Sequence, residues 1–194
     1  MSAAPLAGRH ALVTGAGQGI GAAIARALHA DGATVTLMGR TAAPLAALAA
    51  ALGERAGVAV ADVCDDTALD AAFATLRAER GPLAIVVNNA GASESAPFAR
   101  TDLAAWHRML DVNLLGTVRV TQRALDDLLA APAGRVVNVA STAGLRGHAY
   151  VTAYAAAKHA VVGLTRALAK ELARSAVTVN AVCPGFTETP MLEA

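Results

Sequence analysis

The chain has 194 residues, of which 55% are hydrophobic, 16% charged and 3% aromatic, and its formal net charge is +1. This much apolar material excludes a disordered chain and predicts a core filled mainly by alanine and branched aliphatic residues. The balanced charge, with no dense basic run, argues against a nucleic-acid partner.

Nothing in the sequence predicts a membrane segment, a leader peptide or a metal site. Residues 1–8 lack the basic-then-apolar order of a signal peptide. The longest uncharged apolar run, residues 41–53, is too short to span a bilayer. The two cysteines and five histidines lack the spacing of metal ligands. We therefore expect a soluble, cytoplasmic protein with a single domain over residues 1–194.

Short aliphatic runs alternate along the chain with longer amphipathic segments. The predicted strands are residues 11–14, 34–38, 58–61, 83–88, 135–140 and 177–182. The predicted helices are residues 20–30, 44–52, 65–80, 103–129 and 153–173. Most of the runs are apolar throughout, as in parallel strands covered on both faces. This order predicts a three-layer α/β fold with a doubly wound parallel sheet, similar to the Rossmann fold.

The chain stops a few residues after the last predicted strand, where another helix is expected to begin. On this basis we expect the sequence to be incomplete at its C-terminal end, without an outermost strand and a lid over the substrate crevice.

A glycine-rich segment follows the first predicted strand directly. Glycines stand at positions 15, 17, 19 and 21, and a predicted helix begins at Ile20. Glycine lets the backbone turn sharply and approach a pyrophosphate, whose negative charge then lies at the positive end of the helix. In this position the segment predicts a dinucleotide site.

The end of the second predicted strand bears on the choice of dinucleotide. Folds that bind NAD place a carboxylate there to accept hydrogen bonds from the ribose diol. Here the strand is followed by Gly39 and Arg40. A guanidinium pairs well with a 2′-phosphate, so we expect NADP(H) to be favoured over NAD(H).

Tyr154 and Lys158 are four residues apart within a predicted helix, which places both side chains on one face. A free phenol has a pKa near 10, and a nearby ammonium group lowers it toward the range that acid/base catalysis needs. Ser141 ends the fifth predicted strand and can donate to a carbonyl oxygen in the crevice. These three residues predict a site for proton transfer to a carbonyl or from an alcohol.

With these residues in place, the sequence resembles the short-chain dehydrogenase/reductase family over essentially its whole length. Asn113, Ser141, Tyr154 and Lys158 match the family's catalytic tetrad in order and spacing. The resemblance implies that Tyr154 transfers the proton, Ser141 orients the carbonyl, Lys158 holds the nicotinamide ribose, and Asn113 binds a water through its main chain. It also implies these cofactor-binding residues: Gly15, Gln18, Gly19, Ile20, Gly21, Arg40, Asp62, Val63, Asn89, Ala90, Gly91, Tyr154, Lys158, Pro184, Gly185, Thr187 and Thr189.

The resemblance leaves three functions open. The first is reduction of a 3-ketoacyl thioester, because residues 177–191 resemble the ketoacyl and polyketide ketoreductase branch. The second is oxidation of a 3-hydroxyacyl-CoA, a 3-hydroxy acid or another secondary alcohol. The third is a catalytically silent nucleotide-binding protein, against which the intact tetrad argues.

Three smaller expectations complete the analysis. The resemblance implies a homodimer or homotetramer formed through the helices at 103–129 and 153–173. His148 lies in a loop close to the presumed substrate crevice and is a possible contact there. Asp126 and Asp127 fit a solvated helix end.

Overall fold

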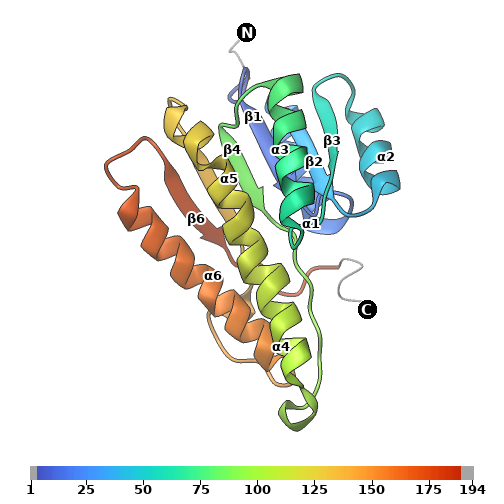
Figure 1. The fold of residues 1–194 in the computed structure, drawn as a ribbon, viewed down its shortest axis with the longest axis vertical. Coiled ribbons are helices and arrows are strands. Elements are labelled where there is room, and N and C mark those ends of the chain that lie inside the picture. The colour runs from blue at the N-terminus through green and yellow to red at the C-terminus, as the bar shows by residue number, and fades with distance from the viewer. Residues whose placement is uncertain (1–3, 189–194) are drawn as a thin grey trace.

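The computed structural model describes residues 4–188, which are built around one six-stranded sheet of order β3-β2-β1-β4-β5-β6 (Figure 1). The strands are β1 (His10–Thr14), β2 (Thr34–Gly39), β3 (Ala56–Val60), β4 (Ile85–Asn88), β5 (Arg135–Val139) and β6 (Thr178–Val182). Every neighbouring pair is parallel. The chain winds outward from β1 to β3 and then returns to the centre at β4, so the predicted doubly wound sheet is confirmed.

Helices cover both faces of the sheet. They are α1 (Gly19–Ala30), α2 (Ala42–Leu52), α3 (Asp66–Arg80), α4 (Leu103–Leu110), α5 (Gly116–Ala130) and α6 (Thr152–Glu171). One core cluster joins α3 and α5 to the sheet and includes the segment after α6, whereas a second cluster joins α1 and α2 to the opposite face. In the described part of the chain, no helix is long and apolar enough to cross a membrane.

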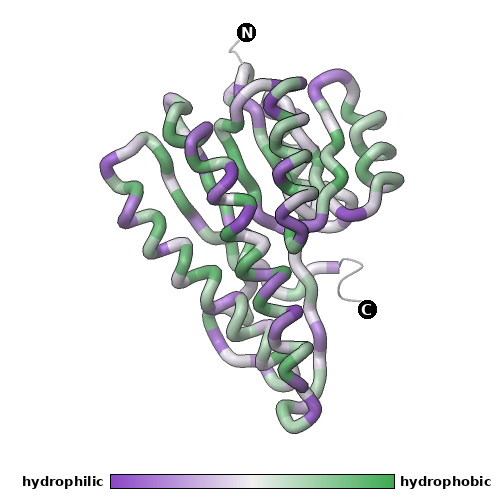
Figure 2. Tube along the Cα trace, viewed as in Figure 1, coloured by the Kyte–Doolittle hydropathy of each residue, from purple (hydrophilic) through white to green (hydrophobic). Residues whose placement is uncertain are grey.

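The central strands are apolar on both faces because each face is buried under helices. Leu12 and Val86 belong to the cluster beneath α3 and α5, while their neighbours Val13 and Val87 belong to the cluster beneath α1 and α2. Figure 2 shows the resulting concentration of hydrophobic residues along the strands and mixed hydropathy along the helices. This pattern explains why the strands are continuous apolar runs in the sequence.

Residues 103–129 are helical as predicted, but they do not form one regular α-helix. Helix α4 ends at Leu110, a π-helical segment called η2 (Asp111–Leu115) follows, and α5 begins at Gly116. Within η2 the backbone N–H of Gly116 donates to the carbonyl of Asp111, five residues back instead of four. The amphipathic pattern continues through η2, so helical periodicity alone does not reveal the interruption.

Asp127 is a second departure from the sequence analysis, because its carboxylate is largely buried rather than solvated. It accepts hydrogen bonds from Arg77 Nε at 2.9 Å and from the backbone N–H of Leu83 at 3.2 Å. Asp127 therefore joins α5 to α3 and to the chain entering β4.

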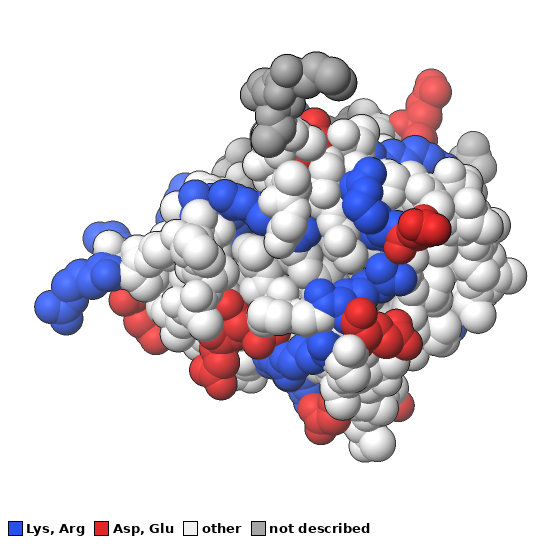
Figure 3. All heavy atoms as spheres, turned by 90° about the horizontal axis from the view of Figure 1, so that it is seen from above, with Lys and Arg blue, Asp and Glu red and all other residues white. Residues whose placement is uncertain are grey.

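The amino edge of the sheet is lined by arginines that donate to backbone carbonyls. Arg55 bonds the carbonyls of His29 and Ala33, and Arg80 bonds that of Ala56. Arg135 bonds the carbonyl of Ala176, just before β6. Figure 3, which views the molecule from above, shows basic side chains spread over this end with acidic ones among them. These guanidinium groups stabilise the turns that lead into the strands.

Candidate active site

Two adjoining cavities lie at the carboxyl edge of the sheet, at the opposite end of the strands from these arginines. Their volumes are about 300 Å³ and about 390 Å³. Ile20, Asn89 and Gly91 line both, so the two cavities form one continuous crevice. Its place is the one where doubly wound sheets bind their ligands, at the point where the helices that follow the neighbouring strands β1 and β4 lie on opposite faces of the sheet.

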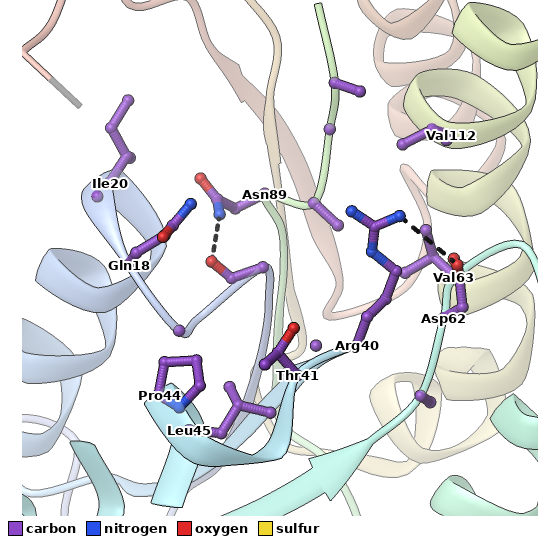
Figure 4. Close-up of a pocket in the computed structure, with 18 residues that line it drawn as sticks. Gln18, Ile20, Arg40, Thr41, Pro44, Leu45, Asp62, Val63, Asn89 and Val112 are labelled. Carbon is purple, nitrogen blue, oxygen red and sulfur yellow. Dashed lines mark hydrogen bonds and ion pairs between the residues drawn. The ribbon is translucent and has the colours of Figure 1, made fainter. Parts of the chain in front are cut away.

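The glycine-rich loop lines one side of the first cavity, where Gln18 and Ile20 are labelled in Figure 4. Gly15 and Gly19 have φ angles of 63° and 54°, a conformation that side chains rarely adopt. The loop leads into α1, whose first turn contains no acidic residue and whose N-cap, Gln18, makes no capping hydrogen bond with its side chain. The positive end of α1 is therefore free to attract a phosphate group.

Gly21 was expected to bind the cofactor directly, but it does not line either cavity. A Cβ atom there would collide with the carbonyl of Gly15 and with Nδ2 of Asn89. Gly21 therefore lets the first turn of α1 pack closely against the loop. This packing helps to hold the loop in the shape that lines the cavity.

Hydrogen bonds between the ends of β1 and β4 fix the shape of this loop. Asn89 Nδ2 donates to the carbonyls of Thr14 and Gly15 at 3.0 and 3.2 Å. Thr14 Oγ1 in turn accepts from the backbone N–H groups of Asn89 and Ala90, both at 3.0 Å. Asn89 thus stabilises the loop by hydrogen bonds and also forms part of the cavity wall.

Arg40 and Asp62 face each other at the outer end of the first cavity (Figure 4). Their closest charged atoms are 4.0 Å apart, and the Arg40 side chain is 75% exposed. An exposed ion pair of this length is weak, so the guanidinium remains available to a ligand. Thr41 is the N-cap of α2 and makes no capping hydrogen bond with its side chain, which leaves a hydroxyl and a positive helix end beside Arg40.

The second cavity collects the side chains expected to perform the chemistry. Ser141, Tyr154, Lys158 and Asn113 all line it, although they come from three different parts of the chain. Lys158 Nζ lies 5.7 Å from the centre of the Tyr154 ring and donates to the carbonyl of Val139 at 2.9 Å. Ser141 is the N-cap of the short 3-10 turn Thr142–Gly144, and its Oγ accepts from the backbone N–H of Ala143 at 3.1 Å.

The acid/base properties of Tyr154 and Lys158 are set mainly by burial. Burial raises the pKa of Tyr154 above its usual value of 10.0, and the Ser141 hydroxyl partly offsets this effect. Burial lowers the pKa of Lys158 from 10.5 to about 8, although the nearby thiol of Cys183 acts in the opposite direction. The sequence analysis expected the ammonium group to lower the pKa of the tyrosine. In the structure desolvation raises the pKa of Tyr154 instead, and the opposing contribution comes from the Ser141 hydroxyl.

Asn113 lies in the π-helical segment and is almost fully buried. Its Nδ2 donates to the carbonyls of Ala92 and Met109 at 2.9 and 3.0 Å. Its Oδ1 accepts from the backbone N–H of Ala92 at 3.4 Å. The side chain therefore ties the loop after β4 to the helix that runs past the active site, while its main-chain carbonyl accepts from Thr117 Oγ1 at 3.1 Å.

The structure brings nearly all of the expected site residues to this crevice. Around the first cavity lie Gly15, Gln18, Gly19, Ile20, Arg40, Asp62, Val63, Asn89, Ala90 and Gly91. Around the second lie Asn113, Ser141, Tyr154, Lys158, Pro184, Gly185 and Thr187. Thr189 falls outside the described residues. Among residues 4–188, no group of histidine, cysteine and acidic side chains is arranged to hold a metal ion.

Sequence reasoning missed several residues of the walls. Thr41, Pro44 and Leu45 close the outer end of the first cavity, and Ser93 and Phe186 line the second. Thr41 could have been found from its place directly after Arg40, since the chain there must turn into a helix. Phe186 carries no such signal, because its contribution depends on how the chain leaves β6.

Comparison with known proteins assigns the chain to a family. A family model described as short chain dehydrogenase matches residues 9–194, and the protein belongs to this family of oxidoreductases. It is 40% identical over 189 residues to the 3-oxoacyl-(acyl-carrier-protein) reductase FabG of Vibrio harveyi, covering 97% of this chain and 78% of the relative. It is 45% identical over 188 residues to a candidate ketoacyl reductase of the granaticin polyketide synthase of Streptomyces violaceoruber, covering 94% and 69%.

A solved structure shows the same fold. A crystal structure of a variant of actinorhodin polyketide ketoreductase with NADPH superposes with a TM-score of 0.91 at 40% sequence identity. The match covers 94% of this chain and 72% of the other. The family membership and the fold expected from the sequence are thereby confirmed.

Proposed function

We propose that the protein reduces a ketone to a secondary alcohol with NADPH, and that its substrate is a 3-ketoacyl thioester. The observation that supports this proposal best is the meeting of the two cavities. The cavity built like a dinucleotide site opens directly into the one that contains Ser141, Tyr154 and Lys158. A cofactor held in the first cavity would therefore present its reactive end to the acid/base residues of the second.

The residues of the first cavity fit NADPH better than NADH. The end of β2 offers Gly39 and Arg40 where an NAD site would offer a carboxylate. Arg40, the hydroxyl of Thr41 and the positive end of α2 together suit a 2′-phosphate. The related actinorhodin enzyme, whose structure contains NADPH, provides independent support.

In the mechanism that we propose, Tyr154 donates the proton and Ser141 positions the carbonyl. The cofactor, when bound, supplies the hydride that reaches the carbonyl carbon. As charge develops on the carbonyl oxygen, the hydroxyl of Ser141 donates a hydrogen bond to it and Tyr154 transfers its proton to it. The products are a secondary alcohol and the oxidised cofactor, and the tyrosine regains its proton from solvent.

Lys158 would hold the cofactor and stabilise the tyrosine after proton transfer. Its ammonium group lies 5.7 Å from the Tyr154 ring centre, close enough to favour the phenolate electrostatically once it forms. Gly91 lies directly beside it, since a Cβ atom there would come within 3.5 Å of Nζ. The absence of a side chain at position 91 thus keeps the path between Lys158 and the first cavity open.

The choice of a 3-ketoacyl thioester is supported by the relatives, which are named as 3-oxoacyl and ketoacyl reductases. The second cavity, at about 390 Å³, is large enough for the reacting part of such a substrate but would leave the remainder of a carrier-bound chain outside.

The test is a set of steady-state rates with NADPH and NADH against acetoacetyl-CoA, cyclohexanone and a sugar ketone. We expect the highest kcat/KM with NADPH and acetoacetyl-CoA. A preference for NADH would contradict the cofactor assignment, and a preference for the sugar would contradict the substrate class. A larger kcat for the oxidation of 3-hydroxybutyryl-CoA than for the reduction of acetoacetyl-CoA, both measured at neutral pH, would favour the dehydrogenase instead.

A further inference from the structure

An ion pair spans the π-helical segment η2. Asp111, the first residue of η2, accepts a hydrogen bond from Arg119 Nη1 on α5 at 2.8 Å. The Arg119 side chain is only 21% exposed, and its Nε lies 3.5 Å from the carboxylate of Asp66 on α3. A charge-assisted hydrogen bond between partly buried groups is stronger than an ion pair on the open surface. The pair therefore holds the first residue of η2 to α5.

The geometry of this pair depends on the extra residue in η2. A regular α-helix turns by about 100° per residue, so side chains eight residues apart point about 80° away from each other. Side chains seven residues apart differ in direction by only about 20°. Because η2 accommodates one additional residue, the spacing of eight residues from Asp111 to Arg119 is equivalent to about seven in a regular helix. The two side chains then lie on the same side, and Arg119 extends toward the N-terminus as long helical side chains do.

Both ends of η2 contact the segment that follows β3 and lines the first cavity. Val63 of that segment and Val112 of η2 lie on the same side of the cavity (Figure 4). At the far end of η2, Gly116 packs so closely that a Cβ atom there would be 2.7 Å from Val63 Cγ2. At the near end, burial and the neighbouring Asp111 carboxylate raise the pKa of the Cys64 thiol to about 12. A change in the register of η2 would therefore shift Val63 and Val112 within this wall.

We infer that Asp111 and Arg119 are positioning residues, whose ion pair fixes the π-helical register and thereby the affinity of the first cavity for the adenosine half of the cofactor. This inference rests on the proposed binding of NADPH in that cavity. Neither residue lines the first or the second cavity, so the pair acts through Val63 and Val112. Without the pair, η2 loses the contact that favours its register over that of a regular α-helix.

The experiment measures dissociation constants by isothermal titration calorimetry for NADPH and for 2′,5′-ADP, which contains the adenosine and the 2′-phosphate but no nicotinamide. We expect Asp111→Asn and Arg119→Gln each to raise both constants at least about tenfold compared with the unaltered 194-residue protein. The double variant should bind no more weakly than either single variant, because both changes remove the same interaction. Arg119→Lys, which keeps the charge, should recover part of the loss.

Arg123→Gln is the matched control, because Arg123 lies one turn further along α5 and pairs with Asp66 and Asp70 of α3. It removes a comparable ion pair without touching η2, so both dissociation constants should stay unchanged. Urea unfolding without cofactor reports any general loss of stability separately. A variant that is less stable in urea but binds both ligands normally would show that the pair only supports the fold.

Three results would overturn the inference: unchanged dissociation constants in Asp111→Asn and Arg119→Gln, losses that add in the double variant, or a loss for NADPH without one for 2′,5′-ADP. In each case the proposed reduction survives. If the neutral variants do not fold, Arg119→Lys decides, since normal binding of both ligands by it would contradict the inference. If the unaltered protein binds neither ligand, the proposed function fails and the inference falls with it.

Discussion

Lys158 combines deep burial with a charge, and its surroundings explain how that is tolerated. Only 4% of the residue is exposed, and its nitrogen has a single described protein acceptor, the carbonyl of Val139. A buried ammonium group with one acceptor is poorly compensated, so its pKa falls to about 8. Additional acceptors from a bound cofactor, such as ribose hydroxyls, would favour the charged form. The binding of the cofactor and the charge of Lys158 should therefore be coupled.

Replacing Tyr154 by phenylalanine removes the proposed proton donor and leaves the ring in place. We expect kcat to fall about 10²- to 10⁴-fold, because that is the typical contribution of acid/base catalysis. NADPH binding, measured by fluorescence titration, should change little. Tyr150→Phe is the matched control, since Tyr150 is exposed and does not line the second cavity. Retention of more than a few per cent of the activity in Tyr154→Phe would show that another group supplies the proton.

Lys158 should also make the stability of the protein depend on pH. The folded protein loses the Lys158 proton near pH 8, whereas the unfolded chain keeps it to about pH 10.5. The charged lysine thus costs stability below pH 8, and that cost is relieved as the pH rises between these values. From pH 7 to pH 9 the relief amounts to about 1 kcal/mol.

In Lys158→Met this gain with pH should disappear, and the variant should be more stable than the unaltered protein at pH 7. Urea unfolding at pH 7, 8 and 9 measures both effects. Lys170→Met, at an exposed position on α6, should retain the pH dependence of the unaltered protein. Identical pH profiles for Lys158→Met and the unaltered protein would mean that Lys158 is not desolvated as the structure indicates.

At the scale of elements, the junction of β2 with α2 concentrates the features that we propose to favour NADPH. Gly39 ends the strand, Arg40 follows, and α2 starts two residues later with its positive end toward the cavity. A side chain at position 39 has room, because its Cβ would be in ordinary contact with Leu45 at 3.6 Å. The junction can thus accept an acidic residue without a change of backbone.

The double variant Gly39→Asp with Arg40→Gln should therefore prefer NADH. It removes the guanidinium partner of the 2′-phosphate and adds a carboxylate that repels phosphate and accepts from a ribose diol. We expect the ratio of kcat/KM for NADPH to that for NADH to fall at least about 100-fold, since a charged hydrogen bond contributes about 1.5–3 kcal/mol. Arg174→Gln, at an exposed position after α6, should leave this ratio unchanged. An unaltered protein that already prefers NADH would make the junction irrelevant to selection.

The sequence predicted the local motifs of this site better than the irregular segment within the helix at residues 103–129. The glycine loop and the spacing of Tyr154 and Lys158 are local patterns, and the structure places them as expected. The π-helical segment Asp111–Leu115 has no signature in the hydrophobic pattern, and contacts made from it reach residues that are distant in sequence. Asn113 bonds the backbone of Ala92, which belongs to the loop after β4.

At the scale of the whole molecule, the central strands of the sheet have more neighbouring strands than the strands at its two edges. β1 and β4 each have two neighbouring strands, whereas β3 and β6 have one among residues 4–188. On β6, Thr178, Asn180 and Val182 are exposed, while Val179 is buried under the helices of the other face. The described part of the chain thus leaves β6 open along one edge and over one face.

Amide hydrogen exchange should follow this gradient. We expect the slowest exchange in peptides from β1 and β4, whose opening requires global unfolding, and the fastest strand exchange in β6. Mass spectrometry of deuterated peptides covering residues 10–14, 85–88 and 178–182 measures the difference. Equal protection of β6 and β1 would indicate that β6 is covered in solution, and dilution of the sample would then tell whether a second copy of the chain provides the cover.

The π-helical segment contains one residue more than a regular α-helix would need, as if one codon had been inserted into the gene. Because Gly116 bonds to a carbonyl five residues back, deleting Leu115 would bring it four residues from Asp111 and allow an unbroken α-helix from Leu103 to Ala130. The helices on either side would keep their buried faces, so circular dichroism should still report a folded protein. Asn113 would be drawn into the regular helix and lose its hold on Ala92, which should raise the KM for NADPH. A deletion that unfolds the protein would instead show that the extra residue is part of the scaffold.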